Sequence, residues 1–318
     1  MKRPEWIPAI LTIAVVVFFA AISPDFRDFR YLLSNTSLYA ETGLLAIGMT
    51  LIIISGNIDL SVGSSVVLTA CLVAKFSSEG TPLPVSVLFA LIIGTLLGTI
   101  SGLLITLAKL PSFLVTLATM ALYRGAAEAI MGPASAKVPH ALKGIDRPDL
   151  FGLPYPLLIF LVVLAIVGIV LHRMILGRWL FGIGTNAEAA RYTGFPVNKA
   201  TISAFAITGL LVGIAALILD SRLGVARNDL AKGYELEAIT IVVAGGTAIS
   251  GGKGTMLGTL LSWLLLYFTK TGMGVNNVKP EYQLTIVGLI LVLSVFAQNV
   301  AASFSNTRQP KPTKIQTG

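Results

Sequence analysis

The sequence predicts an all-α polytopic membrane protein with about ten transmembrane helices, some of them short and broken. Of its 318 residues, 55% are hydrophobic and only 12% are charged, whereas soluble domains carry about 25% charged residues. The hydrophobic residues lie in long blocks, and a helix needs roughly 20 of them to cross a bilayer. Composition and grouping together indicate an integral membrane protein.

The expected helices are bounded by charged, Gly and Pro residues at the ends of the apolar blocks. The first block follows Lys2 and Arg3. It is long for a signal peptide and has large residues at the cleavage position, so it is expected to remain as a helix. Residues 1–300 are expected to form the transmembrane domain, and 301–318 a disordered cytoplasmic tail. The expected helices cover residues 7–22, 39–55, 60–74, 85–108, 112–131, 155–173, 200–219, a short segment after 237, 256–268 and 282–300.

Two spacings predict contacts made by these helices. Gly94, Gly98 and Gly102 recur every four residues and form a smooth stripe that favours close helix packing. Arg124 and Glu128 are also four residues apart and are predicted to form a structural ion pair. A faint twofold organisation is present as well, because GNIDLSVGS and GYELEAITIVVAGG each join a short helix to Gly and a carboxylate.

The polar stretch at residues 56–59 interrupts two apolar blocks. Polar groups inside a membrane are costly unless they bond to backbone or face a water-filled cavity. Asn57 and Asp59 are therefore expected to cap the helix that follows, to line a polar path, or to do both. Glu235 and Glu237 open another short helix, where carboxylates favour the positive end of the helix dipole.

Residues 177–196 form the most soluble-looking part of the chain. They contain an Ala-rich core, Asn186 as a helix cap, and Gly194 and Pro196 as a stop. The stretch predicts a short exposed helix, which is either a contact site for a soluble partner or a plain connector.

Several function classes are not supported by the sequence. HExxH, GxSxG and CxxC are missing, and GGKGT at residues 251–255 departs from the phosphate-binding loop at two positions. We therefore expect no enzyme activity, no metal, no cofactor and no ATP binding by a recognisable motif. The net charge of +8 is assigned to membrane topology and lipid contact, not to nucleic acid.

Four motifs carry a resemblance to a known family. They are SGNIDLSVGS (55–64), LPSFLVTLATMALYRG (110–125), GRWLFGIGTNAEAARYTGFPV (177–197) and GYELEAITIVVAGGTAISGGKGTMLGT (233–259). In this order they resemble the permease subunits of ribose-type bacterial ABC sugar importers, which also serve xylose, rhamnose, galactose and autoinducer-2. The family more often has two glycines before Ile58 and Asp59, and here Asn57 takes the second place.

The resemblance implies a multi-pass protein of the bacterial inner membrane with both termini in the cytoplasm. It implies a second permease copy or a sister permease, a cytoplasmic ATP-binding subunit and a periplasmic sugar-binding protein as partners, and alternating access as the mechanism. The implied coupling residues for the ATP-binding subunit are Arg178, Asn186, Glu188, Ala189, Ala190, Arg191 and Gly194. The residues expected along the substrate path are Asn57, Asp59, Ser61, Ser64, Tyr234 and Glu235.

Two alternatives remain at this point. A branched-chain amino-acid ABC permease shares the general scheme, although the IDLSVGS motif favours a sugar. An ion-coupled secondary carrier would need carboxylate relays inside the membrane, and Asp59 and Glu128 are few and lie near helix ends.

Overall fold

The structure is a computed structural model that describes residues 6–77, 81–132, 135–138, 142, 148–150 and 152–306. Within these ranges a helix occupies the place of every expected span. These helices are α1 (Trp6–Ile22), α3 (Ala40–Ile54), α4 (Val62–Phe76), α5 (Leu83–Ala108), α6 (Ser112–Met131), α7 (Tyr155–Arg173), α10 (Val197–Leu223), α11 (Tyr234–Ala244), α12 (Met256–Val275) and α13 (Pro280–Asn306).

The other elements are short. They are the 3₁₀ turns η1 (Asp25–Arg27) and η2 (Thr36–Tyr39), the helices α2 (Phe29–Asn35), α8 (Ile175–Thr185) and α9 (Ala187–Tyr192), and the antiparallel pairs β1 (Ala136–Lys137) with β4 (Val225–Ala226) and β2 (Pro148–Leu150) with β3 (Leu153–Pro154). Five helices of the described chain are long and apolar enough to cross a membrane: Phe29–Ile54, Leu83–Ala108, Ser112–Met131, Tyr155–Arg173 and Val197–Leu223. The all-α polytopic class is confirmed.

Three helices run well beyond their expected bounds, and for α10 and α12 the reason is that the stop signals lie further along the chain. Helix α10 begins directly after Pro196 and continues through the polar residues 220–222 to Gly224, which adopts the left-handed conformation (φ 66°). Helix α12 continues to Val275 and ends before Asn277 (φ 56°). Left-handed residues are common just past helix ends, so these two positions stop the helices. Helix α13 extends to Asn306, and residues 307–318 of the expected tail lie outside the described chain.

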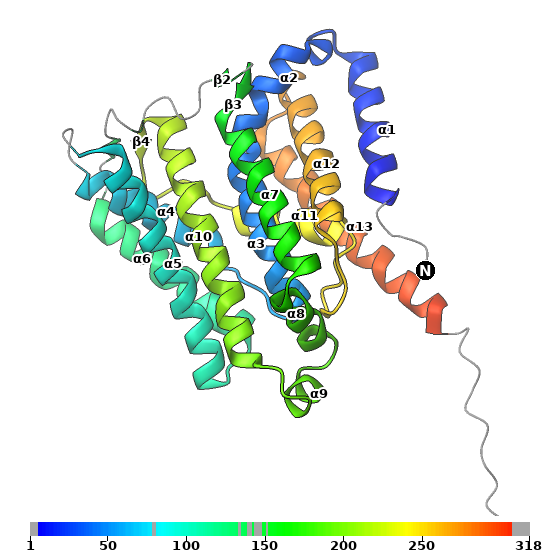
Figure 1. Ribbon diagram of the computed structural model, residues 1–318. Helices are drawn as coiled ribbons and strands as arrows, with labels where there is room; N and C mark the ends of the chain where they lie inside the picture. Colours follow the sequence, from blue (N-terminus) through cyan, green and yellow to red (C-terminus); the bar gives the residue numbers. More distant parts are fainter. Residues whose placement is uncertain are drawn as a thin grey trace, which may run out of the picture.

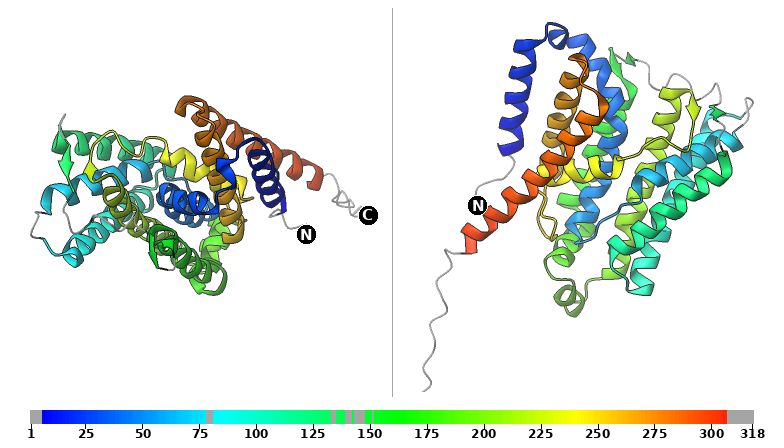
Figure 2. Two further views of the ribbon diagram at one scale, coloured as in Figure 1. Left: turned by 90° about the horizontal axis from the view of Figure 1, so that it is seen from above. Right: turned by 180° about the vertical axis from the view of Figure 1, so that it is seen from behind.

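Helix α3 is the centre of the molecule, and all of its residues are buried. It packs against α7, α8, α10, α11 and α12, and the view from above shows it surrounded by them (Figure 2). Its glycines permit this crowding: a Cβ added at Gly43 would lie 2.7 Å from the Trp263 indole nitrogen.

The predicted glycine stripe is confirmed as a packing surface. Helices α5 and α10 lie side by side (Figure 1), and a Cβ added at Gly94 would lie 2.4 Å from the carbonyl oxygen of Gly209. A Cβ added at Gly98 would lie 2.3 Å from that of Phe205. Only glycine allows the two backbones to approach so closely.

The predicted ion pair between Arg124 and Glu128 is wrong. Arg124 instead donates from Nη1 to the carbonyl oxygens of Asn228 (2.9 Å) and Leu230 (2.8 Å), which lie just before α11. The guanidinium satisfies backbone acceptors that are distant in the sequence, while Glu128 is exposed.

The two halves of the faint repeat are α3 to α6 and α10 to α13, and their packing partners correspond. Helix α4 packs on α10, α5 and α6, and α11 packs on α3, α12 and α13. Each half thus places its short helix against the first helix of the other half. The faint repeat in the sequence has a counterpart in the packing of the structure.

Candidate functional site

The break between α3 and α4 is a glycine-terminated turn. Gly56 has φ 80°, its N–H donates to the Ile53 carbonyl (2.9 Å), and the N–H of Asn57 donates to that of Ile52 (3.1 Å). This is the Schellman arrangement, in which a left-handed glycine closes a helix. Helix α11 ends in the same way, since Gly246 (φ 87°) donates to Val243 and Thr247 to Val242.

Three of the expected path residues form one hydrogen-bonded set at the start of α4. Asp59 Oδ1 accepts from the backbone N–H (2.8 Å) and the hydroxyl (2.6 Å) of Ser61, and the Ser64 hydroxyl donates to the Ser61 carbonyl (2.8 Å). All three residues are buried. Asp59 therefore secures the residue just before α4 and does not bond inside its first turn.

Among the described residues no side chain caps α4, so the prediction that Asn57 and Asp59 cap this helix is wrong: Asp59 binds only Ser61, which precedes the helix. The side-chain amide of Asn57 turns back and donates to the Ser55 hydroxyl (3.0 Å). Asn57 is partly exposed, and its free carbonyl end is available to other groups.

The first turn of α6 holds the break in place, which sequence reasoning missed. The Ser112 hydroxyl accepts from the N–H of Ile58 (3.1 Å). The Thr116 hydroxyl shares its proton between the carbonyl of Ser112 in its own helix (2.9 Å) and that of Ile58 (3.2 Å). Both groups lie on one face of α6, four residues apart. Both hydroxyl residues lie in the motif at 110–125. Their spacing places them on one face of a helix, but it does not show which backbone groups they bind.

The start of α11 lies against the start of α4. A Cβ added at Gly63 would lie 2.4 Å from Glu235 Oε2, so this carboxylate covers the backbone between Ser61 and Ser64. The structure therefore brings Glu235 together with the Asp59 set, which also belongs to the residues expected along the substrate path. Glu235 itself is only partly buried.

Tyr234 belongs to a second polar group, formed by two ion pairs that were not predicted. Arg222 binds the fully buried Glu41 (3.0 Å), and Lys270 binds Glu237 (2.5 Å). Tyr234 lies beside Arg222. These charges come from α3, α10, α11 and α12, so no local spacing in the sequence could have paired them.

The exposed connector contains a short helix, as predicted. Asn186 Oδ1 accepts from the N–H of Ala189 (2.9 Å) and caps α9, and Gly194 (φ 83°) ends it. Glu188, Ala189 and Arg191 are exposed, whereas Ala190 is buried. Helix α9 projects at one end of the molecule (Figure 1).

Helix α8, which precedes α9, was not expected as a separate element. It carries the exposed Arg178, while Leu180 and Ile183 are buried against the core. Arg178 therefore lies on a different helix from the other predicted coupling residues.

A junction of glycine backbones connects the end of α8 to the break after α3 and to the loop after α11. The N–H of Gly252 donates to the carbonyl of Ile54 (2.8 Å) at the end of α3. A Cβ added at Gly184 would lie 1.9 Å from that carbonyl oxygen and 2.4 Å from the Gly252 nitrogen. A Cβ added at Gly251 would lie 2.9 Å from the Cα atoms of both Gly184 and Gly56. The end of α8, the break after α3 and the loop after α11 are therefore in direct backbone contact.

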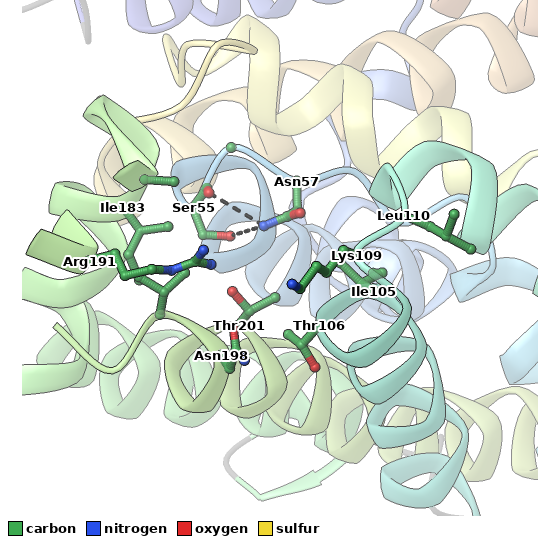
Figure 3. Close-up of a pocket in the computed structure, with 13 residues that line it drawn as sticks. Ser55, Asn57, Ile105, Thr106, Lys109, Leu110, Ile183, Arg191, Asn198 and Thr201 are labelled. Carbon is green, nitrogen blue, oxygen red and sulfur yellow. Dashed lines mark hydrogen bonds between the residues drawn. The ribbon is translucent and has the colours of Figure 1, made fainter. Parts of the chain in front are cut away.

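A cavity of about 320 Å³ lies beside this junction. It brings the predicted path residue Asn57 and the predicted coupling residue Arg191 to one space (Figure 3). The remaining lining residues come from the break, the end of α5, α8, α9 and the start of α10: Ser55, Gly56, Ile105, Thr106, Lys109, Leu110, Ile183, Ala187, Val197, Asn198 and Thr201.

Comparison with known proteins agrees with these features. The family described as branched-chain amino acid transport system / permease component matches residues 31–295. The Autoinducer 2 import system permease protein LsrD of Escherichia coli (strain K12) and that of Shigella flexneri are each 35% identical over 300 residues, or 92% of this chain and 91% of theirs. No solved structure matches. The chain therefore belongs to this permease family, and its resemblance to the ribose-type importer permeases is confirmed.

Proposed function

We propose that this chain is the transmembrane permease subunit of an ATP-driven importer for a monosaccharide or a related small polyol. Membership of the permease family supports the transport role, and the named cargo of the similar proteins, autoinducer 2, supports the substrate class. The backbone junction at Gly184 carries the mechanistic part of the proposal, because it connects the exposed helix α9 to both breaks.

Helix α9 is the docking site for a cytoplasmic ATP-binding subunit. It presents Glu188, Ala189 and Arg191 to solvent, and its cap and stop hold it as a rigid unit. Arg178 on α8 extends this surface. Cations also surround this end of the molecule, at Arg173 and Lys199 among others, which favours a cytoplasmic position.

Movement of α9 reaches the membrane core through the junction. At Gly184 and Gly251 backbone meets backbone with no side chain between them, so a displacement of α8 cannot be absorbed by a rotamer change. It must move the end of α3 or the loop after α11. Alternating access follows when these two elements, and with them the starts of α4 and α11, change position together.

The cargo contacts are made by partly exposed polar residues on these moving parts. Asn57, Tyr234 and Glu235 offer amide, hydroxyl and carboxylate groups for sugar hydroxyls. Asp59, Ser61 and Ser64 are bonded to one another in this conformation, and they join the path when the gate opens. Few direct contacts imply weak binding, which suits a protein that releases its cargo.

The complete importer contains further parts. A periplasmic sugar-binding protein delivers the cargo, and a second permease, either this chain or a sister chain, completes the channel. The exposed apolar faces of α1, α6 and α13 are covered by lipid or by that second permease. Both termini lie in the cytoplasm, and the complex resides in the bacterial inner membrane.

Isolation of the complex from the native membrane in mild detergent tests this function. We expect a stoichiometric ATP-binding subunit to accompany the chain, and vesicles containing the complex to accumulate labelled autoinducer 2 or a pentose when ATP and the binding protein are present. Labelled leucine serves as the competing cargo. Recovery of the chain alone, under conditions that preserve a reference ABC importer, would contradict the proposal, as would uptake of leucine only.

A further inference from the structure

The cavity beside the junction contains two cations and no acid. Lys109 and Arg191 both line it, and none of its lining residues is a carboxylate. Neither of these two side chains forms an ion pair within the described chain. Figure 3 shows their polar ends directed toward each other across the space. Two like charges facing a common cavity repel each other until an anion enters.

The backbone conformation of Lys109 sets the position from which its side chain extends into the cavity. Lys109 ends α5 in the left-handed conformation, with φ 54° and ψ 34°. This conformation costs a residue other than glycine about 1 kcal/mol or more, and it ends α5 here as left-handed residues commonly end helices. A glycine at this position would remove the strain and also the charge.

A free hydroxyl group completes the site. Thr201 is only 4% exposed, lines the cavity, and its hydroxyl has no hydrogen-bond partner among the described residues. The amide of Asn198, one turn earlier on α10, reaches the same space. The cavity therefore offers a guanidinium, an ammonium, a hydroxyl and an amide group, which are the donors that phosphate oxygens accept from.

From this geometry we propose that the cavity is a binding site for a phosphate-bearing ligand. Its volume of about 320 Å³ is at the lower end for small-molecule sites, which suits a phosphate monoester of a small polyol. The phosphate can belong to a soluble metabolite or to a lipid headgroup, because one of the lining residues, Leu110, is apolar and exposed.

Glycerol 3-phosphate is a suitable probe, because it is a soluble polyol phosphate and also the headgroup chemistry of an anionic lipid. We would measure its equilibrium binding to the full-length permease in nanodiscs of phosphatidylcholine, with glycerol as the uncharged control. We expect saturable binding that weakens with added salt, and no binding of glycerol. Absence of saturable binding would overturn the proposal.

Charge-neutral variants locate the site. Lys109→Gln and Arg191→Gln should each weaken binding about tenfold or more, because each removes a charge-assisted hydrogen bond. Lys199→Gln is the matched control: it removes an exposed cation from the residue next to Asn198, but Lys199 does not line the cavity. Equal weakening in all three variants would show general attraction to a basic surface and would refute the assigned site.

A second lipid composition identifies the source of the phosphate. In nanodiscs that contain phosphatidylglycerol, competition that raises the apparent Kd of glycerol 3-phosphate, and that disappears in Lys109→Gln, assigns the site to a lipid headgroup. Unchanged affinity assigns it to a soluble ligand. Because binding is measured on the permease without transport, failure of this proposal is separate from failure of the proposed function.

Discussion

Substitution of Gly184 by alanine tests the link between α8 and the gate. The added Cβ would lie 1.9 Å from the Ile54 carbonyl oxygen and 2.4 Å from the Gly252 nitrogen, and both of these are backbone atoms. Ordinary contact begins at 3.4 Å, so α8 and the end of α3 must separate by about 1.5 Å. The hydrogen bond from Gly252 to Ile54 (2.8 Å) lies in the same place and is lost with this movement.

The cost follows from these two effects. Overpacking of a well-packed site costs about 1–3 kcal/mol, and loss of one backbone hydrogen bond about 1 kcal/mol. We therefore expect Gly184→Ala to destabilise the closed junction by about 2–4 kcal/mol. The complex should still assemble, because α9 lies outside the clash, but ATP hydrolysis should no longer respond to the binding protein and cargo.

Three measurements on the purified complex separate the possibilities: the melting temperature of the permease, the ATPase rate with and without the binding protein, and uptake into vesicles. Gly125→Ala is the control, since a Cβ added at Gly125 meets nothing within 4 Å. We expect a lowered melting temperature and a loss of stimulated ATPase only in Gly184→Ala. A Gly184→Ala complex with the melting temperature and coupling of the wild type would refute the argument from backbone contact.

Three further substitutions test other parts of the structure. Glu188→Arg reverses an exposed charge on α9 and should leave membrane insertion intact while uncoupling ATPase from uptake; normal cargo-stimulated uptake would exclude the docking role. Asp59→Ala removes the acceptor of both Ser61 bonds and should lower uptake and melting temperature by a loss of about 1–3 kcal/mol, so unchanged values for both would reject a structural and a path role alike. Arg222→Gln leaves the fully buried carboxylate of Glu41 without its charge partner and should cost about 3–5 kcal/mol; the double variant with Glu41→Gln should recover much of this stability, and an additive further loss would disprove the pairing.

The helices themselves could be predicted because their signals are local. Apolar length defines a span, and glycine or proline defines its end, so α6 and α7 were obtained with the bounds that the structure has. The break at Gly56 and the cap at Asn186 could be predicted for the same reason, since each depends on the backbone of its immediate neighbours.

The partners of polar side chains could not be predicted in this way. Arg124 and Glu128 have ideal spacing for a pair on one helix, yet the guanidinium binds carbonyl groups about a hundred residues away. In an isolated helix, a side chain pairs with residues three or four positions away. In a packed membrane protein, backbone carbonyl groups that water does not reach also need hydrogen-bond donors. Which acceptors those are depends on the arrangement of all the helices.

The sequence by itself determined the membrane class, the order of the helices, the break before Asp59 and the exposed helix α9. Each of these depends on hydrophobicity or backbone conformation within a few residues. Only the tertiary structure decided that Gly184, Gly251 and Gly56 meet, and that Lys109 and Arg191 face one cavity. A glycine or a cation can occur at many positions of a chain for different reasons. Its contacts, and therefore its role, are decided only when segments distant in the sequence pack together.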